Sequence, residues 1–339
     1  MSDQPPIPKV TVLMTLYNKG EFVGATVESI LNNTFRDLEL LVVDDASTDD
    51  GLEVVRSFTD PRIRILSSAK NTGRAAAANR GYDAATGEYI AVVDADDLVD
   101  PERFQKQVEF MDANPDIGAV GSAIQGFGAN DLLFRWKEDD TYNRGRLLFG
   151  LPVSYPAAMI RRSILEAHHI RCNENWKIPG MDYLFFLSMA PHMRFANLPE
   201  ALIKYRMGEQ NMRHGRNAIA DRIELDKEVF RMVGFPITKE QLALHVYLSE
   251  GDPTGLTASK VPELWKWMNE LKEMNQSKDT FPEPIFSNEV DRRWERLFDL
   301  LADQDAAAAL AHARCSRTVS LNSIAHIGKR MVRRISGDK

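Results

Sequence analysis

Apolar runs of strand type and apolar spacings of helix type alternate along the first third of the chain. Continuous apolar runs predict strands at 10–16, 38–43, 63–66 and 88–93. Apolar residues at three- and four-residue spacing predict helices between and after these strands, including 74–85 and 104–111. This βαβαβαβα order is typical of an α/β fold of Rossmann-like type, with a mostly parallel sheet flanked by helices.

The pattern changes near residue 216, after which helical spacing dominates. We predict helices over 223–233, 239–248, 262–274, 288–301 and 303–315. We therefore expect an α/β domain at 1–215 and a helical C-terminal extension at 216–339. Trp265 and Trp294 share helical faces with other apolar residues, so core packing is a better interpretation for them than a sugar-binding platform.

Three carboxylates stand where the strand at 88–93 ends: Asp94, Asp96 and Asp97. Ligands of open α/β sheets collect at the carboxyl ends of the strands. Carboxylates this close repel one another, and a hard cation such as Mg²⁺ or Mn²⁺ relieves that repulsion while leaving positions for phosphate oxygens. The alternative interpretation is that these carboxylates cap the next helix. Residues 100–102 already supply such a cap.

The turns after the first three strands carry further polar and aromatic residues. They read Thr15-Leu16-Tyr17-Asn18, Asp44-Asp45-Ala46-Ser47 and Asn71-Thr72-Gly73-Arg74. Tyr17 offers a flat face for a nucleobase, and Asp44 or Asp45 can accept a hydrogen bond from a base imide or a ribose hydroxyl. Each turn alone is also explained as a helix cap or a plain turn, but together they predict a nucleoside pocket beside a diphosphate and metal pocket.

Composition changes this picture little. The chain has 339 residues, of which 44% are hydrophobic and 27% charged, as in an ordinary globular protein. Cys172 and Cys315 lack the spacing of a metal or disulfide motif. No apolar run is long enough to span a membrane, and the first residues do not resemble a signal peptide, so we expect a cytoplasmic protein.

Charge is distributed unevenly along the chain, whose net charge is −7, because a basic C-terminal segment follows an acidic body. Residues 314–339 hold seven Lys or Arg against one acid, Asp338. Apolar residues from Leu321 to Ile335 alternate with these bases at helical spacing, which predicts a basic amphipathic helix at 318–339. We expect it either to lie on an anionic membrane surface, placing the protein at the inner face of the plasma membrane, or to dock on the acidic domain. Nucleic-acid binding is not expected.

The quoted turns resemble those of the family 2 inverting glycosyltransferases, which have the GT-A fold. The matching segments are TLYN at 15–18, VVDDASTD at 42–49, NTG at 71–73 and EYIAVVDADD at 88–97. The resemblance implies that Asp94 and Asp96 form a DxD element that holds a divalent metal, Mg²⁺ or Mn²⁺. It also implies a set of residues that bind the nucleotide-sugar donor: Thr15, Leu16, Tyr17, Asn18, Asp44, Asp45, Asn71, Gly73, Arg74, Asn79, Asp94, Ala95 and Asp96.

The resemblance continues more weakly to about residue 216. The helix start at Met181-Asp182 is similar to the family's Glu-Asp element, which makes Asp182 the expected catalytic base. Residues 202–206 resemble the family's closing strand, and residues 207–214 a loop that can cover the donor. The chain departs from the family pattern at Thr15 (usually Pro), Ala78 (usually Arg), Tyr155 (often His) and Met181 (usually Glu).

The expected function is therefore metal-dependent inverting transfer of a sugar from a UDP-sugar to a hydroxyl of a glycan or lipid-linked acceptor in bacterial surface-polysaccharide synthesis. A dTDP or GDP donor remains an alternative. Two other classes fit parts of the pattern: a nucleotide-sugar-binding protein with weak catalysis, because Met181 replaces a Glu, and a receiver-like signalling domain. The latter does not account for Tyr17 or for the Asp182 segment.

Overall fold

The computed structural model describes residues 7–208 and 215–316. The chain divides into two compact units, one made of Met1–Asn143 and Leu151–Gly215, the other of Arg144–Gly150 and Arg216–Lys339. The second unit thus contains the short segment Arg144–Gly150, which the sequence pattern placed in the first domain. The predicted amphipathic helix at 318–339 lies outside the described residues, as does most of the loop at 207–214.

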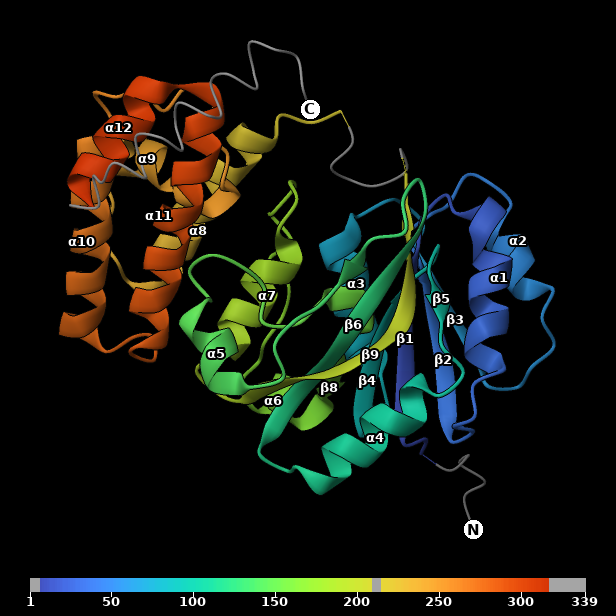
Figure 1. Cartoon of the computed structure of the whole chain (residues 1–339). Coiled ribbons are helices and arrows are strands. Elements are labelled where there is room, and N and C mark those ends of the chain that lie inside the picture. Colours follow the sequence, from blue (N-terminus) through green and yellow to red (C-terminus); the bar gives the residue numbers. More distant parts are fainter. Residues whose placement is uncertain (1–6, 209–214, 317–339) are drawn as a thin grey trace. The chain divides into compact units, whose positions relative to one another are not determined.

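The first half of unit 1 is a parallel sheet. Strands β1 (Val10–Leu16), β2 (Leu38–Asp44), β3 (Ile63–Ser67) and β4 (Tyr89–Asp94) lie in the order β3-β2-β1-β4. Helices α1 (Gly20–Leu31) and α2 (Gly51–Arg56) lie on one side of it and α3 (Arg74–Ala84) on the other (Figure 1). Nearly every residue of β1, β2 and β4 is buried, as expected for strands covered on both faces.

The sheet continues beyond β4 with a mixture of strand directions. It is nine-stranded, and its order past β4 is β8 (Met159–Arg161), β6 (Ile117–Gly128), β9 (Arg194–Met207) and β5 (Leu98–Val99), with β7 (Leu133–Phe134) beside β6. The pairs β4·β8, β6·β8, β5·β9 and β6·β7 are antiparallel, whereas β6·β9 is parallel. Parallel pairing, as predicted, therefore holds for the first four strands and for β6·β9, and the other pairs are antiparallel. The α/β class itself is confirmed.

Four short elements and one longer helix complete unit 1. Their bounds are α4 (Arg103–Ala113), α5 (Asp140–Gly145, which runs into unit 2), a single 3₁₀ turn (Tyr155–Ala157), α6 (Arg162–Ala167) and α7 (Met181–Met189). Buried side chains of α4 fix the point where the sheet changes direction. Arg103 donates to the carbonyls of Val92 and Ala158, and Gln107 donates to that of Ala157. Burial lowers the pKa of Arg103 to about 9.

Unit 2 is helical. It contains α8 (Ala218–Val233), α9 (Lys239–Glu250), α10 (Val261–Lys278), α11 (Ile285–Gln304) and α12 (Ala306–Cys315), so the five helices predicted here are confirmed. Segment Arg144–Gly150 is bound among them: the ring of Phe149 stacks on His245 and lies under the guanidinium of Arg293. Trp294 is buried and packs against Trp265 at 4.9 Å between ring centroids, as the core interpretation of these residues predicted. Among the described residues, no helix is long and apolar enough to cross a membrane.

Unit 2 should lose stability in mild acid because it buries a neutral histidine. His312 stacks on Trp294, and burial lowers its pKa from 6.5 to about 4. The unfolded chain takes up a proton at His312 between these values and the folded chain does not, so stability is full above pH 6.5 and falls as the pH drops toward 4. We expect wild type to lose about 2 kcal/mol more than His312→Gln between pH 7 and pH 5 in urea unfolding.

The comparison with His312→Gln is needed because other groups titrate in the same range. Burial raises the pKa of Asp226 to about 6, so its effect has the opposite sign: stability from this carboxyl is lost as pH rises. Subtracting the variant's curve from the wild-type curve leaves the contribution of His312. Parallel curves for the two proteins would contradict a neutral, buried His312.

Candidate active site

The carboxyl ends of β1, β2 and β4 meet at one edge of the sheet. Leu16 of β1 is level with Asp44 of β2, and Thr15 is level with Asp94 of β4. The turns that follow these strands therefore lie side by side, as the strand pattern predicted. The same edge receives the third turn, because Ser67 of β3 is level with Asp44.

The first two turns are bonded to each other. Asn18 has a positive φ of 52°, and its side-chain oxygen accepts a hydrogen bond from the backbone N–H of Thr48 at 2.8 Å. In return, the backbone N–H of Asn18 donates to the hydroxyl of Ser47, whose own N–H donates to Asp44. The neighbouring Tyr17 is 46% exposed, which is unusual for an aromatic residue beside a buried strand. Its face is available to a flat ligand.

Asp45 holds the third turn against the second. Its carboxylate accepts hydrogen bonds from the backbone N–H groups of Thr72 and Gly73 at 3.0 and 2.7 Å, and from the hydroxyl of Thr72. Gly73 has a φ of 92°, a backbone conformation that glycine adopts without strain. Asn71 and Arg74 flank this turn and are exposed. Asp45 therefore shapes the pocket whether or not it also touches a ligand.

The acidic turn after β4 is opposed by two cations from other turns. The ammonium of Lys19 lies 2.5 Å from Asp96, and the guanidinium of Arg74 lies 3.2 Å from Asp94. Burial raises the pKa of Asp94; Arg74 lowers it, and the charges of Asp96 and Asp182 raise it further. Lys19 was missed in the sequence, although it directly follows TLYN. Its role appears only once the first turn is folded next to the acidic one.

Asp97, the third acid of this cluster, is hydrogen-bonded to β9. Its side chain is fully buried, and one carboxyl oxygen accepts the backbone N–H of Arg206 in β9 at 2.9 Å. Burial, with repulsion from Asp94, raises the pKa of Asp97 to about 9. Only Asp94 and Asp96 remain as candidate metal ligands in this turn.

Asp182 belongs to the same site. It is the second residue of α7, which begins after Gly180 in a left-handed conformation, and it accepts a hydrogen bond from the N–H of Tyr183. Its charge raises the pKa of both Arg74 and Asp94, so the three groups lie within electrostatic reach of one another. The expected base and the acidic turn, 88 residues apart by number, therefore share the cation Arg74.

The ring of Tyr155 packs against the guanidinium of Arg74. The guanidinium of Arg74 lies 5.4 Å from the centre of the Tyr155 ring, within the range of a cation–π contact. The Tyr155 hydroxyl is hydrogen-bonded to that of Tyr82 at 2.8 Å, and burial raises the pKa of both phenols well above their usual value. The buried pair stays neutral and fixes the ring on which Arg74 rests.

Several of the predicted donor-binding residues have buried side chains, Asp44 and Asp45 among them, and three of these are packed or bonded within the protein. Asn79 is buried, and its amide pairs with the backbone of Cys172 and with Glu174, so it ties α3 to the segment that precedes Asp182. The side chains of Leu16 and Ala95 belong to the core. A donor contact of these three residues stays a prediction, and for Leu16 and Ala95 it would have to use backbone atoms. Thr15 is partly buried at the end of β1.

The oxygen ligands at this edge fit a divalent cation only in part. Within the described ranges, no three His, Cys, Asp or Glu side chains converge to hold a metal ion. Mg²⁺, however, is commonly bound through one or two carboxylates together with substrate phosphates. Asp94 and Asp96 meet that requirement because they are hard oxygen donors whose mutual repulsion contributes to the raised pKa of Asp94. They would hold the ion in the presence of a diphosphate.

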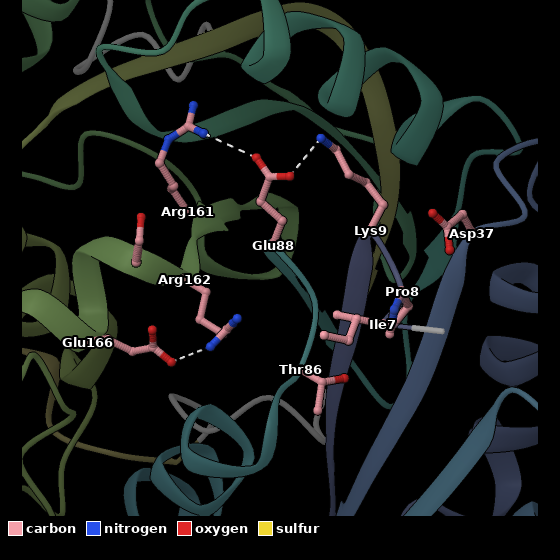
Figure 2. Close-up of a pocket in the computed structure, with 10 residues that line it drawn as sticks. Ile7, Pro8, Lys9, Asp37, Thr86, Glu88, Arg161, Arg162 and Glu166 are labelled. Atoms are coloured by element: carbon pink, nitrogen blue, oxygen red, sulfur yellow. Dashed lines mark hydrogen bonds and ion pairs between the residues drawn. The ribbon is translucent and has the colours of Figure 1, made fainter. Parts of the chain in front are cut away.

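A second hollow, of about 320 Å³, lies at the opposite edge of the sheet, where β1 and β4 begin (Figure 2). Charged side chains line it, but many are paired with one another. Lys9 and Arg161 both approach Glu88, at 2.8 and 3.7 Å, and Arg162 pairs with Glu166. This hollow is remote from Tyr17 and from the acidic turn, so we place the active site at the other edge.

Comparison with known proteins identifies the family of the chain. The family model "Glycosyl transferase family 2" matches residues 11–168. The Bacillus subtilis protein EpsE, whose name assigns it to the glycosyltransferases, is 37% identical over 206 residues, which cover 59% of this chain and 73% of EpsE. The succinoglycan biosynthesis protein ExoO of Rhizobium meliloti is 31% identical over 220 residues, covering 60% of this chain and 62% of ExoO.

A solved structure is similar over nearly the whole chain. The structure of S. aureus TarS 1–349 in complex with UDP-GlcNAc superposes with a TM-score of 0.61 at 19% identity, and covers 97% of this chain and 92% of that one. Fold and site together define a glycosyltransferase with the GT-A fold. The chain belongs to glycosyl transferase family 2.

Proposed function

We propose that this enzyme is an inverting glycosyltransferase of polysaccharide biosynthesis. It moves a sugar from a UDP-sugar to a hydroxyl of a glycan or lipid-linked acceptor on the cytoplasmic side of the cell. The observation that carries the proposal is the gathering of Tyr17, Asp44, the Asp94–Asp96 turn and Asp182 at one sheet edge, with Arg74 between the last two.

The nucleoside part of the donor is assigned to the first two turns. The exposed ring of Tyr17 can stack on a flat base, and the carboxylate of Asp44 can accept a hydrogen bond from the imide of uracil. Similarity to TarS, whose structure contains UDP-GlcNAc, supports uridine as the nucleoside. The acceptor class is supported by similarity to ExoO, a succinoglycan biosynthesis protein.

The diphosphate is assigned to the edge between Lys19 and Arg74. A divalent ion bound with the donor through Asp94 and Asp96 would neutralise charge on the leaving nucleoside diphosphate. Lys19 and Arg74, now paired with these carboxylates, would then be free to contact phosphate oxygens. Two fixed cations at this edge stabilise the negative charge that develops as the sugar leaves.

Asp182 is assigned as the general base. Its carboxylate can take the proton of the acceptor hydroxyl as that oxygen attacks the anomeric carbon. A single displacement from the face opposite the leaving group inverts the anomeric configuration. The positive charge of Arg74 lies within electrostatic reach of Asp182 and interacts favourably with its carboxylate.

A donor panel tests the proposal. Purified protein with Mn²⁺ and UDP-, dTDP- or GDP-sugars is expected to release nucleoside diphosphate fastest from a UDP-sugar, because Tyr17 and Asp44 suit uracil. Coupled detection of the released diphosphate measures all donors in one format. Binding of a UDP-sugar without any release, in the presence of a range of acceptor glycans, would instead favour a nucleotide-sugar-binding protein.

A further inference from the structure

Arg206 of β9 forms two hydrogen bonds with the acidic turn that follows β4. The Nε–H of Arg206 donates to the carbonyl oxygen of Asp96 at 2.9 Å, and its backbone N–H donates to the carboxyl of Asp97 at 2.9 Å. One residue thus contacts two successive members of the turn, once through its side chain and once through its main chain. Arg206 lies 110 residues away from Asp96 in the sequence.

The guanidinium of Arg206 is itself fixed by two aromatic rings. Its central carbon lies 4.3 Å from the ring centre of Phe22 in α1 and 4.5 Å from that of Phe127 in β6. Both distances fall within the range of cation–π contacts. A planar guanidinium suits this position better than a lysine ammonium, because it can contact both rings and still direct an N–H at the carbonyl of Asp96.

The turn has one further side-chain support, from α1. The hydroxyl of Thr26 donates to the carbonyl of Ala95 at 3.1 Å, while Asp97 N–H donates to the carbonyl of Asp94 within the turn. Asp97 is fully buried, and its second carboxyl oxygen has no hydrogen-bond partner among the described residues. The other oxygen of this buried carboxyl accepts the hydrogen bond from the backbone N–H of Arg206. Loss of that hydrogen bond would be costly, because the carboxyl is buried.

We propose that Arg206 is a positioning residue for the metal and diphosphate site. It does not reach the donor; it acts through the carbonyl of Asp96, whose side chain is the assigned metal ligand. Groups that orient metal ligands through a second layer of hydrogen bonds usually change metal affinity by about 10- to 100-fold when removed. This inference rests on the proposed function, because it assumes that Asp94 and Asp96 bind the ion and the diphosphate.

The test is the affinity of Mn²⁺ in the presence of UDP, measured by electron paramagnetic resonance of free Mn²⁺. Arg206→Ala is expected to weaken this affinity by about 10- to 100-fold and to raise the KM for donor more than it lowers kcat. Arg206→Lys is expected to lie between Ala and wild type, since it keeps a donor and a charge but loses the planar contact with both rings.

The matched control is Arg194→Ala. Arg194 begins the same strand, is about half exposed, and pairs with Asp116 and Asp140, away from the acidic turn. It should leave Mn²⁺ affinity unchanged. Should Arg206→Ala fail to fold, Phe127→Leu removes one of the two rings and keeps the arginine; a smaller loss of affinity in the same direction is then expected.

The outcomes separate this inference from the proposed function. If wild type binds Mn²⁺ with UDP and Arg206→Ala, or Phe127→Leu in its place, binds it equally well, the positioning role is overturned and the proposed function stands. An equal loss in Arg194→Ala would also overturn it, because the effect would then be general destabilisation. If wild type itself does not bind Mn²⁺ with UDP, the metal site fails and this inference fails with it.

Discussion

Replacing Asp182 by Asn is expected to lower the transfer rate by about 10²- to 10⁴-fold, the usual contribution of a general base, while donor affinity stays nearly the same. The amide keeps the size of the side chain but cannot take a proton from the acceptor hydroxyl. Asp182 accepts a hydrogen bond from the backbone N–H of its neighbour Tyr183. The proposed function assigns it to the acceptor hydroxyl and not to the nucleotide. Steady-state kinetics and calorimetric titration of donor measure the two effects separately.

A carboxylate in a similar helix position provides the control for Asp182→Asn. Asp221 lies in the first turn of α8, as Asp182 does in α7, and forms an ion pair with Arg216 in unit 2. Asp221→Asn removes a favourable helix-terminus charge of the same kind without touching the proposed site. Its rate should match wild type. If Asp182→Asn kept its rate and bound donor poorly, another group would be the base.

Asp96→Asn is expected to abolish metal-dependent donor binding and transfer. An amide oxygen is a much poorer ligand for a hard cation than a carboxylate, and the change also leaves Lys19 without its 2.5 Å partner. Titration of UDP-sugar with and without Mn²⁺ should show a gain in affinity from the metal in wild type and none in the variant. Full transfer by wild type in EDTA would refute the metal assignment itself.

The control for Asp96→Asn is Asp83→Asn. Asp83 is an exposed carboxylate of α3 in the same unit, paired with Arg171 at 2.6 Å. Exposed ion pairs contribute little to stability, so this variant should behave as wild type in both titrations. Metal dependence that fell equally in both variants would indicate a general electrostatic effect of lost negative charge.

The parallel half of the sheet was predictable because its strands are buried on both faces. Such strands are continuous apolar runs, and for β1 the predicted bounds, Val10–Leu16, are those of the structure. In the mixed half, the expected closing strand at 202–206 lies within β9, but β6 was not predicted. β6 contains Gly118, Gly121 and Gly126, and glycines in a sequence favour turns over strands.

The reason for those glycines is tertiary. A Cβ at Gly118 would lie 2.5 Å from the side chain of Met193, and one at Gly121 would lie 2.4 Å from that of Asn197. The glycines let neighbouring segments approach β6 closely, which no local pattern encodes. The same holds for the contacts of Asn79, whose side-chain amide donates to Cys172 and Glu174, 93 and 95 residues further on.

The sequence by itself determined the class of fold and the family, and it predicted the edge of the sheet at which we propose that the chemistry lies. Strand ends, turn residues and the run Asp94-Ala-Asp96-Asp97 are local features. Tertiary structure alone decided the pairing of Lys19 with Asp96, the place of Arg74 between Asp94 and Asp182, and the support of the acidic turn by Arg206. These contacts join residues that are distant in the chain and come together only when the sheet and its turns are folded. No local sequence pattern encodes them.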